Sequence, residues 1–128
     1  MLVKVFGSAV HGVSAITITI EVDTVPGSGY YIVGLPDIAV KESVDRILSA
    51  YKNNDYKSPR YKIVVNMAPA DIRKAGSAYD LPIAIGMLAA TEQISSSILE
   101  SYVIMGELQL DGTLRPVKGT LPMAIQAR

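Results

Sequence analysis

Three residues of this chain could together carry out nucleophilic chemistry: Ser77, Lys74 and Lys118. A serine hydroxyl attacks only when a neighbouring base takes its proton, and a lysine amine can be that base. Lys74 lies three residues before Ser77, whereas Lys118 belongs to a later segment. The alternative is that Gly76 bends the loop and Ser77 hydrogen-bonds local backbone. Because a lone motif is weak evidence of catalysis, we favour the alternative.

A glycine-rich phosphate loop is missing from the sequence. Neither G-x-x-x-x-G-K-[ST] nor G-x-G-x-x-G occurs in it. The N-termini of helices predicted at residues 37, 81 and 121 could attract an anion. However, Asp37 and Asp80 already place negative charge at two of these helix starts. We therefore expect that this stretch of protein does not hydrolyse ATP by itself.

Four carboxylates are candidate magnesium ligands, because hard cations prefer oxygen; they are Asp71, Asp80, Glu107 and Asp111. Asp80 also fits the N-cap of a helix, and Asp111 precedes Gly112 in a predicted hairpin turn. These structural roles account for both residues. The sequence therefore predicts no metal site, and no catalytic or cofactor-binding residue is assigned.

The segment 51–62 interleaves aromatic and basic residues, which suits single-stranded nucleic acid because rings stack on bases and cations meet phosphates. Its members of these types are Tyr51, Lys52, Tyr56, Lys57, Arg60, Tyr61 and Lys62. The alternative is a helix end with favourable lysines, followed by a solvated loop and the start of a strand. Because Tyr51 continues the apolar stripe of a predicted helix, we favour the alternative.

Composition narrows the class of protein. The chain has 128 residues, the length of one domain, with 12 basic and 12 acidic residues, so a globally basic surface is excluded. It has no cysteine, hence no disulfide, thiol nucleophile or thiolate metal site. The single histidine, His11, is expected to be a polar turn residue. No signal peptide or apolar run of ~18 residues occurs, so we expect a cytoplasmic protein without a membrane span.

Hydrophobic periodicity places these residues on a mixed set of elements. Strands are predicted over 2–7, 13–22, 30–33, 61–66 and 102–105, helices from 37, from 81 to 91 and from 121, and a hairpin over 108–115. The first three strands suggest an antiparallel meander. The long loop 67–80 carries the candidate chemistry, and loops of this length are usually functional. Because helices do not alternate regularly with strands, an α+β layered domain is favoured.

Three separated motifs resemble the N-terminal domain of the ComM/YifB family of magnesium-chelatase-related competence proteins. They are Gly34-Leu35-Pro36-Asp37 with Val40-Lys41-Glu42-Ser43, the run 66–90, and the run 106–119. The resemblance covers essentially the whole chain and all three motifs occur in the family's order. It implies a two-layer α+β sandwich of the ribosomal protein S5 domain 2-like type, similar to the proteolytic domain of Lon proteases.

The Lon resemblance also tests for catalysis. Lon enzymes carry their serine in a loop of the form Lys-Asp-Gly-Pro-Ser-Ala-Gly; laid on the run 74–80, that serine falls on Ala78. Their lysine follows Pro-Val-Gly-Gly-Leu, which places it on Leu121. Both positions are apolar here, while Ser77 and Lys118 lie one and three residues away. Such a displacement redirects side chains, and catalysis does not tolerate errors of ~1 Å.

The family resemblance implies a longer protein. Its members continue into an AAA+ ATPase module that uses ATP and Mg²⁺, and they act as hexameric motors that promote branch migration of DNA during natural transformation. We therefore expect residues 1–128 to be one Lon-like domain cut from such a chain. Its expected role is non-catalytic, in contact with its own ATPase module, neighbouring subunits and DNA or a partner protein. The alternatives are a Ser/Lys peptidase using Ser77 and a DNA-contact module through residues 51–62.

Overall fold

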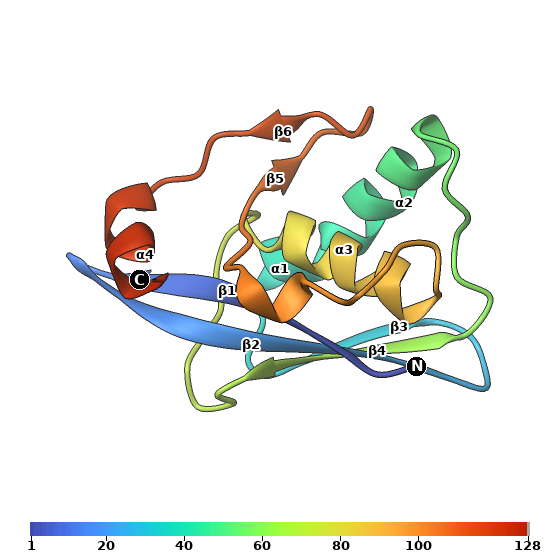
Figure 1. Ribbon diagram of the computed structural model, residues 1–128, viewed down its shortest axis with the longest axis horizontal. Coiled ribbons are helices and arrows are strands. Elements are labelled where there is room, and N and C mark those ends of the chain that lie inside the picture. Colours follow the sequence, from blue (N-terminus) through green and yellow to red (C-terminus); the bar gives the residue numbers. More distant parts are fainter. Residues whose placement is uncertain (128) are drawn as a thin grey trace.

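Helices α1 (Ile38–Lys41), α2 (Ser43–Asn53) and α3 (Asp80–Ala90) gather on one face of a sheet, as Figure 1 shows for this computed structural model. The structure describes residues 1–127, and the side chain of His11, expected in a turn, lies outside the described part. This mixture of a four-stranded sheet, a two-stranded sheet and several helices agrees with the predicted α+β class. None of the helices within residues 1–127 has the length and apolarity to cross a membrane.

The elements follow the predicted order with altered bounds. The strands are β1 (Val3–His11), β2 (Ser14–Val25), β3 (Tyr30–Val33), β4 (Lys62–Ala68), β5 (Glu107–Leu108) and β6 (Leu114–Arg115). The helices are α1 (Ile38–Lys41), α2 (Ser43–Asn53), α3 (Asp80–Ala90), the 3₁₀ turn η1 (Leu99–Ser101) and α4 (Thr120–Ala127). The single helix predicted from residue 37 is divided at Glu42, which caps α1 and precedes α2.

The predicted meander of the first three strands is wrong. The sheet order is β1-β2-β4-β3, so β4 lies between β2 and β3. β1 and β2 form an antiparallel hairpin, β2 and β4 are antiparallel, and β3 is parallel to β4. Parallel neighbours need a crossover connection, which α1 and α2 supply here between β3 and β4.

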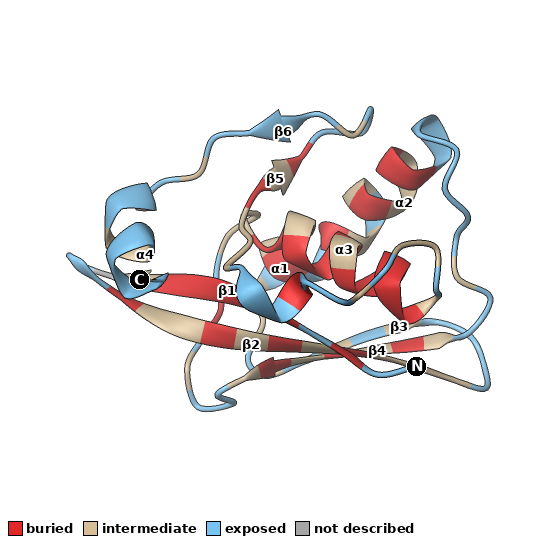
Figure 2. Cartoon of the chain, viewed as in Figure 1, coloured by how far each residue is buried: buried red, intermediate tan, exposed pale blue. Residues whose placement is uncertain are grey.

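The core is made by alternating residues of the strands, by the apolar helix α3, and by the buried faces of α1 and α2. In β4, Ile63, Val65 and Met67 are buried while their neighbours are half-buried, as expected for a strand with one covered face. α3 is buried along most of its length, which explains why it is apolar nearly all round. Figure 2 shows buried residues concentrated where α3 lies over the strands.

Gly86 sets the distance between α3 and the sheet. A Cβ atom at this position would lie 2.6 Å from Cγ2 of Val22 on β2. Real side chains do not tolerate such a contact without a shift, so a glycine in the middle of this helix permits the close packing. The helix therefore lies directly over β1 and β2.

The strand predicted over 102–105 is reduced to one parallel bridge between Phe6 and Val103. The Ile104 amide donates a hydrogen bond to the Phe6 carbonyl at 2.8 Å, and the chain then turns away from β1.

The predicted hairpin is present but short, and it consists of β5 and β6. Its turn follows the prediction, because Asp111 Oδ1 accepts hydrogen bonds from the Thr113 amide (2.9 Å) and hydroxyl (2.7 Å).

Candidate functional site

The loop that joins β4 to α3 forms one wall of a groove of about 570 Å³. The end of β1 and the segment 116–118 form the other walls. Residues of β5 and α4 also line the groove, and Figure 1 shows the course of these segments. Ser77 and Lys118 both line this groove, whereas Lys74 does not. The structure thus brings together only two of the three residues that could do nucleophilic chemistry.

The Ser77 hydroxyl is hydrogen-bonded to a carboxylate and not to an amine. Its hydroxyl donates a hydrogen bond to Oε1 of Glu107 on β5. The other oxygen of that carboxylate lies 3.5 Å from Nε of Arg115 on β6. The expectation that Ser77 bonds local backbone is therefore wrong, because its partner is distant in sequence. A carboxylate bound to a guanidinium fixes the position of the hydroxyl but does not supply the amine of a Ser–Lys pair.

Lys74 is fully buried, and its amine is hydrogen-bonded to backbone carbonyls and not to Ser77. Its Nζ donates to the Gly34 carbonyl at 2.7 Å and to the Pro69 carbonyl. Burial holds the pKa of the Lys74 amine below its usual value, because desolvation penalises the charged form, and the Asp71 charge opposes this shift more weakly. A lowered pKa often marks a catalytic lysine, but this amine joins two backbone segments. Lys74 is therefore a structural residue of the loop.

The turn 34–37 anchors the same loop from a second side. Asp37 Oδ1 caps α1 by accepting from the Val40 amide at 2.8 Å, as predicted, while its Oδ2 accepts from the Gly76 amide at 3.1 Å. Gly34 has a φ of +106°, and a Cβ there would lie 2.1 Å from the Met67 carbonyl oxygen. Only glycine fits that approach, so the turn and the loop are packed backbone to backbone.

The two positions on which the Lon resemblance places a catalytic pair, Ala78 and Leu121, do not line the same groove. Ala78 lines the groove, and its carbonyl accepts the Gly106 amide at 2.8 Å. Leu121 is 72% exposed on α4 and does not line the groove. Among residues 1–127 no hydrogen bond joins Ser77 to Lys118. The described residues thus form a groove in which no Ser–Lys pair is assembled.

Asp80 is not an N-cap, contrary to the prediction. It is the first residue of α3, it is completely buried, and it accepts hydrogen bonds from Ser43 Oγ (2.6 Å) and from the Leu108 amide (3.1 Å). Arg46 also binds it through two nitrogen atoms. Sequence reasoning missed Ser43 and Arg46. The available signal was their i, i+3 spacing, which places both on one face of α2.

The four carboxylates considered for magnesium do not converge. Asp80 is bound by Arg46, Glu107 by Ser77 and Arg115, and Asp111 by its own turn. No group of three or more acidic or histidine side chains in the described part of the chain is arranged to hold a metal ion.

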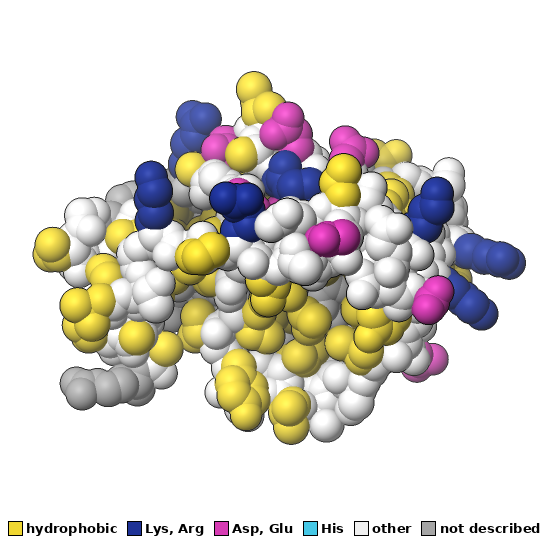
Figure 3. Space-filling view, turned by 90° about the horizontal axis from the view of Figure 1, so that it is seen from above, with side chains coloured by type: hydrophobic (Ala, Val, Ile, Leu, Met, Phe, Trp, Pro, Cys, Tyr) yellow, Lys and Arg dark blue, Asp and Glu magenta, His cyan; other side chains and the backbone are white. Residues whose placement is uncertain are grey.

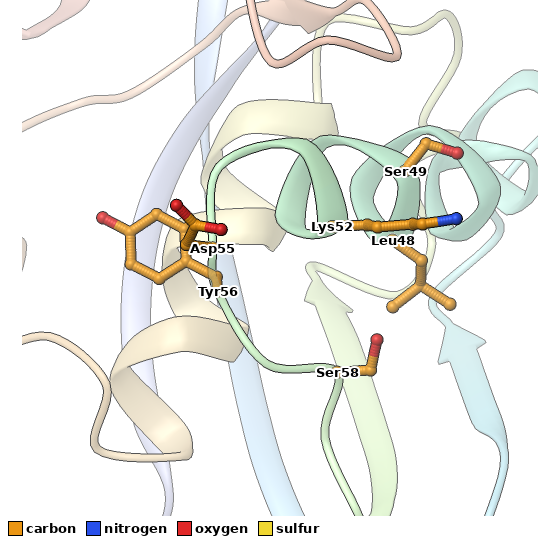
Figure 4. Close-up of a pocket in the computed structure, with 6 residues that line it drawn as sticks. All are labelled: Leu48, Ser49, Lys52, Asp55, Tyr56 and Ser58. Atoms are coloured by element: carbon orange, nitrogen blue, oxygen red, sulfur yellow. The ribbon is translucent and has the colours of Figure 1, made fainter.

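The segment 51–62 does not form a single aromatic and basic surface. Tyr51 is buried, and its hydroxyl donates to the Ala84 carbonyl. Lys62 Nζ lies 4.7 Å from the centre of the Tyr31 ring. Figure 4 shows the shallow hollow at the end of α2, where the side chains of Lys52 and Tyr56 point in opposite directions. On the face seen in Figure 3, basic side chains stand in separate small groups with acidic ones among them.

Comparisons with known proteins identify relatives of this chain. Residues 20–128 match the protein family described as subunit ChlI of Mg-chelatase. The chain is 50% identical to the uncharacterized protein YifB of Salmonella typhimurium over 120 residues, which cover 93% of this chain and 24% of that protein. It is 45% identical to the competence protein ComM of Haemophilus influenzae over 128 residues, 99% of this chain and 25% of that protein. The chain thus spans about a quarter of the length of these relatives.

Proposed function

Because this chain belongs to the magnesium-chelatase-related family that includes YifB and ComM, we propose that it is a non-catalytic accessory domain of a longer AAA+ ATPase. The ATPase uses ATP and Mg²⁺ and acts as a motor in DNA processing, such as branch migration during natural transformation. The relatives are about four times as long as this chain, which leaves room for the motor.

The observation that supports a non-catalytic role is that neither Lys74 nor Lys118 is hydrogen-bonded to Ser77 within residues 1–127. Ser77 donates to Glu107, and the Lys74 amine donates to two backbone carbonyls. A Ser–Lys peptidase needs the amine of its lysine within hydrogen-bond reach of the serine. Lys118, the remaining candidate, lines the same groove but makes no hydrogen bond to Ser77 within residues 1–127.

The Lon-like fold is part of the proposal. A sheet with helices on one face, a long loop before the buried α3 and a short hairpin after it support a ribosomal protein S5 domain 2-like architecture. On this proposal the ATPase module binds ATP and Mg²⁺, because residues 1–128 contain no phosphate loop. The partners of this domain are then its own ATPase module and the neighbouring subunits of a cytoplasmic homohexamer, together with DNA or a partner protein.

The test uses the whole gene product. We expect it to hydrolyse ATP, to leave fluorescent peptides and casein intact, and to form no adduct between a fluorophosphonate and Ser77. Ser77→Ala should not change ATP hydrolysis, and Ser95→Ala, at an exposed site away from the groove, is the matched control. Peptide cleavage that disappears in Ser77→Ala but persists in Ser95→Ala would establish the peptidase alternative instead.

A further inference from the structure

Ser8 carries a buried hydroxyl without a hydrogen-bond partner. The residue is 1% exposed and lines the groove, and among the described residues its Oγ is the buried side-chain polar atom that lacks a partner. A buried polar group left unpaired costs about 1–3 kcal/mol. Such groups are rare in folded proteins and call for an explanation, of which a ligand that completes the hydrogen bond is one.

Within residues 1–127, no strand pairs with the outer edge of β1 beside this hydroxyl. β2 pairs with β1 along its whole length on the other side. On the outer side, Ile104 bonds to the Phe6 carbonyl, and the chain then leaves towards α3. Because hydrogen-bonding groups alternate between the two edges of a strand, Ser8 and Val10 direct their backbone groups the same way as Phe6.

The outward-facing backbone amides and carbonyls of Ser8 and Val10 have only weak hydrogen-bond partners or none among the described residues. The Ser8 amide meets the Met105 sulfur at 3.4 Å, a weak acceptor, and the Ser8 carbonyl accepts the Tyr79 hydroxyl at 3.3 Å. Val10 comes next on the outer edge, at the groove. In the described part of the chain no strand pairs with this stretch of the outer edge. An unpaired strand edge is a template for an added strand.

The groove has an excess of positive charge. Arg73 and Lys118 line it, both are exposed, and neither forms an ion pair within residues 1–127. Its one acidic group, Glu107, is already bound by Ser77 and Arg115. The remaining wall is apolar and is formed by Val10, Met105, Pro116, Val117 and Met123.

We propose that this groove binds an extended acidic peptide segment. The peptide adds as a strand to the outer edge of β1 at Ser8 and Val10, its backbone completes the hydrogen bond of the Ser8 hydroxyl, and its carboxylates meet Lys118 and Arg73. A volume of about 570 Å³ is that of a typical ligand site. A strand edge and an apolar wall recognise amides and side chains, so a peptide fits better than a sugar–phosphate backbone. This activity extends the proposed accessory role from contact in general to one class of partner.

The experiment is an array of random acetylated hexapeptides probed with the fluorescently labelled whole protein at low salt. We expect the bound peptides to be enriched in Asp and Glu, and N-methylation at alternate residues to abolish binding because it removes strand-pairing amides. Lys118→Glu should weaken binding about tenfold, since it reverses a charge at the site, and less at high salt. Lys52→Glu, at an exposed lysine that does not line the groove, should leave binding unchanged.

The variant Ser8→Ala distinguishes an effect on peptide binding from an effect on protein stability. The change removes an unpaired buried hydroxyl, so the thermal stability of the protein should not fall, whereas peptide affinity should fall several-fold. The inference is overturned if no hexapeptide binds above background, or if N-methylated peptides bind as well as unmodified ones. It is also overturned if Lys118→Glu and Lys52→Glu act equally. Cleavage of bound peptides that depends on Ser77 would contradict the proposed function instead, so the two failures are distinguishable.

Discussion

Arg46 on α2 holds Asp80 at the start of α3 by two parallel hydrogen bonds, Nε to Oδ2 at 2.7 Å and Nη2 to Oδ1 at 2.9 Å. Asp80 is completely buried, while the Arg46 side chain keeps 22% of its exposure. The pair fixes the N-terminal end of α3 against α2, directly after the loop that lines the groove. A buried carboxylate thus determines where the candidate site begins.

Arg46→Met should be more destabilising than Asp80→Asn. The first change leaves a buried carboxylate without its cation, which costs about 3–5 kcal/mol. The second leaves a guanidinium that can reach water, and its cost is about 1–3 kcal/mol. Urea unfolding of the 128-residue chain at neutral pH measures both. Glu42→Gln is the control, because Glu42 lies 3.9 Å from Arg46 at the surface and should contribute under about 1 kcal/mol. Equal effects of the two changes would contradict the asymmetry.

Gly86→Ala should destabilise the chain by about 1–3 kcal/mol, because the added Cβ would overlap the Val22 side chain. Val22→Ala removes the overlapping methyl groups. The double variant should therefore lose less stability than the sum of the two single variants, with a coupling of about 0.5–3 kcal/mol. A double-mutant cycle from urea unfolding measures this coupling, and strict additivity would show that α3 can move away from the sheet.

Lys74→Met should loosen the loop before α3. The change removes the donor to the Gly34 and Pro69 carbonyls, at a cost of about 1–3 kcal/mol. We expect faster hydrogen exchange at the Gly76 amide, which is protected through Asp37. Lys118→Met, at an exposed lysine, should leave this exchange rate unchanged. Unchanged exchange in Lys74→Met would show that Asp37 holds the loop alone.

Tyr79 should make the chain less stable in alkali. Burial, assisted by the Asp37 charge, raises the pKa of the Tyr79 hydroxyl from 10.0 to about 12. The folded state therefore keeps a proton that the unfolded state releases above pH 10. This contribution is complete below pH 10 and is lost as the pH rises through 12, by about 1 kcal/mol between pH 10 and 11.

Tyr79→Phe tests this assignment, because it should remove that part of the decline in unfolding free energy between pH 10 and 11. Tyr51→Phe is the matched comparison, since burial also raises the pKa of Tyr51. A decline that is identical in the wild type and in Tyr79→Phe would contradict the assignment.

If the segment 51–62 contacts single-stranded DNA, we expect its basic side chains to contribute and the Tyr51 ring not to. Replacing Lys52, Lys57 and Arg60 by Gln should reduce the salt dependence of binding by about 0.7 for each phosphate contact that is lost. Tyr51→Phe should change affinity little, because the ring is buried and cannot stack on a base. Fluorescence anisotropy with a labelled oligonucleotide at several salt concentrations measures both. If the triple change has no effect, this segment does not contact DNA.

Local patterns predicted the elements well. Period-two alternation located β1 and β2, the apolar centre of residues 61–66 located β4, and the nearly uniform apolarity of residues 81–90 indicated a buried helix. The Asp37 cap and the Asp111 turn were also predictable, because each depends on residues within three positions. The pairing of β3 was not, since its own residues suit either neighbour and the crossover through α1 and α2 decides the direction.

The groove also has some features that the sequence predicts and others that only the tertiary structure decides. By itself the sequence determined the family and the absence of a phosphate loop, and it put the apolar residues Ala78 and Leu121 at the positions where the resemblance to Lon proteases predicts a catalytic pair. Only the tertiary structure decided that Ser77 meets Glu107, that Lys74 is buried between two carbonyls, and that the Ser8 hydroxyl is left unpaired. Side-chain partners distant in sequence depend on how the sheet and α3 pack, and burial then sets the strength of each charge and hydrogen bond.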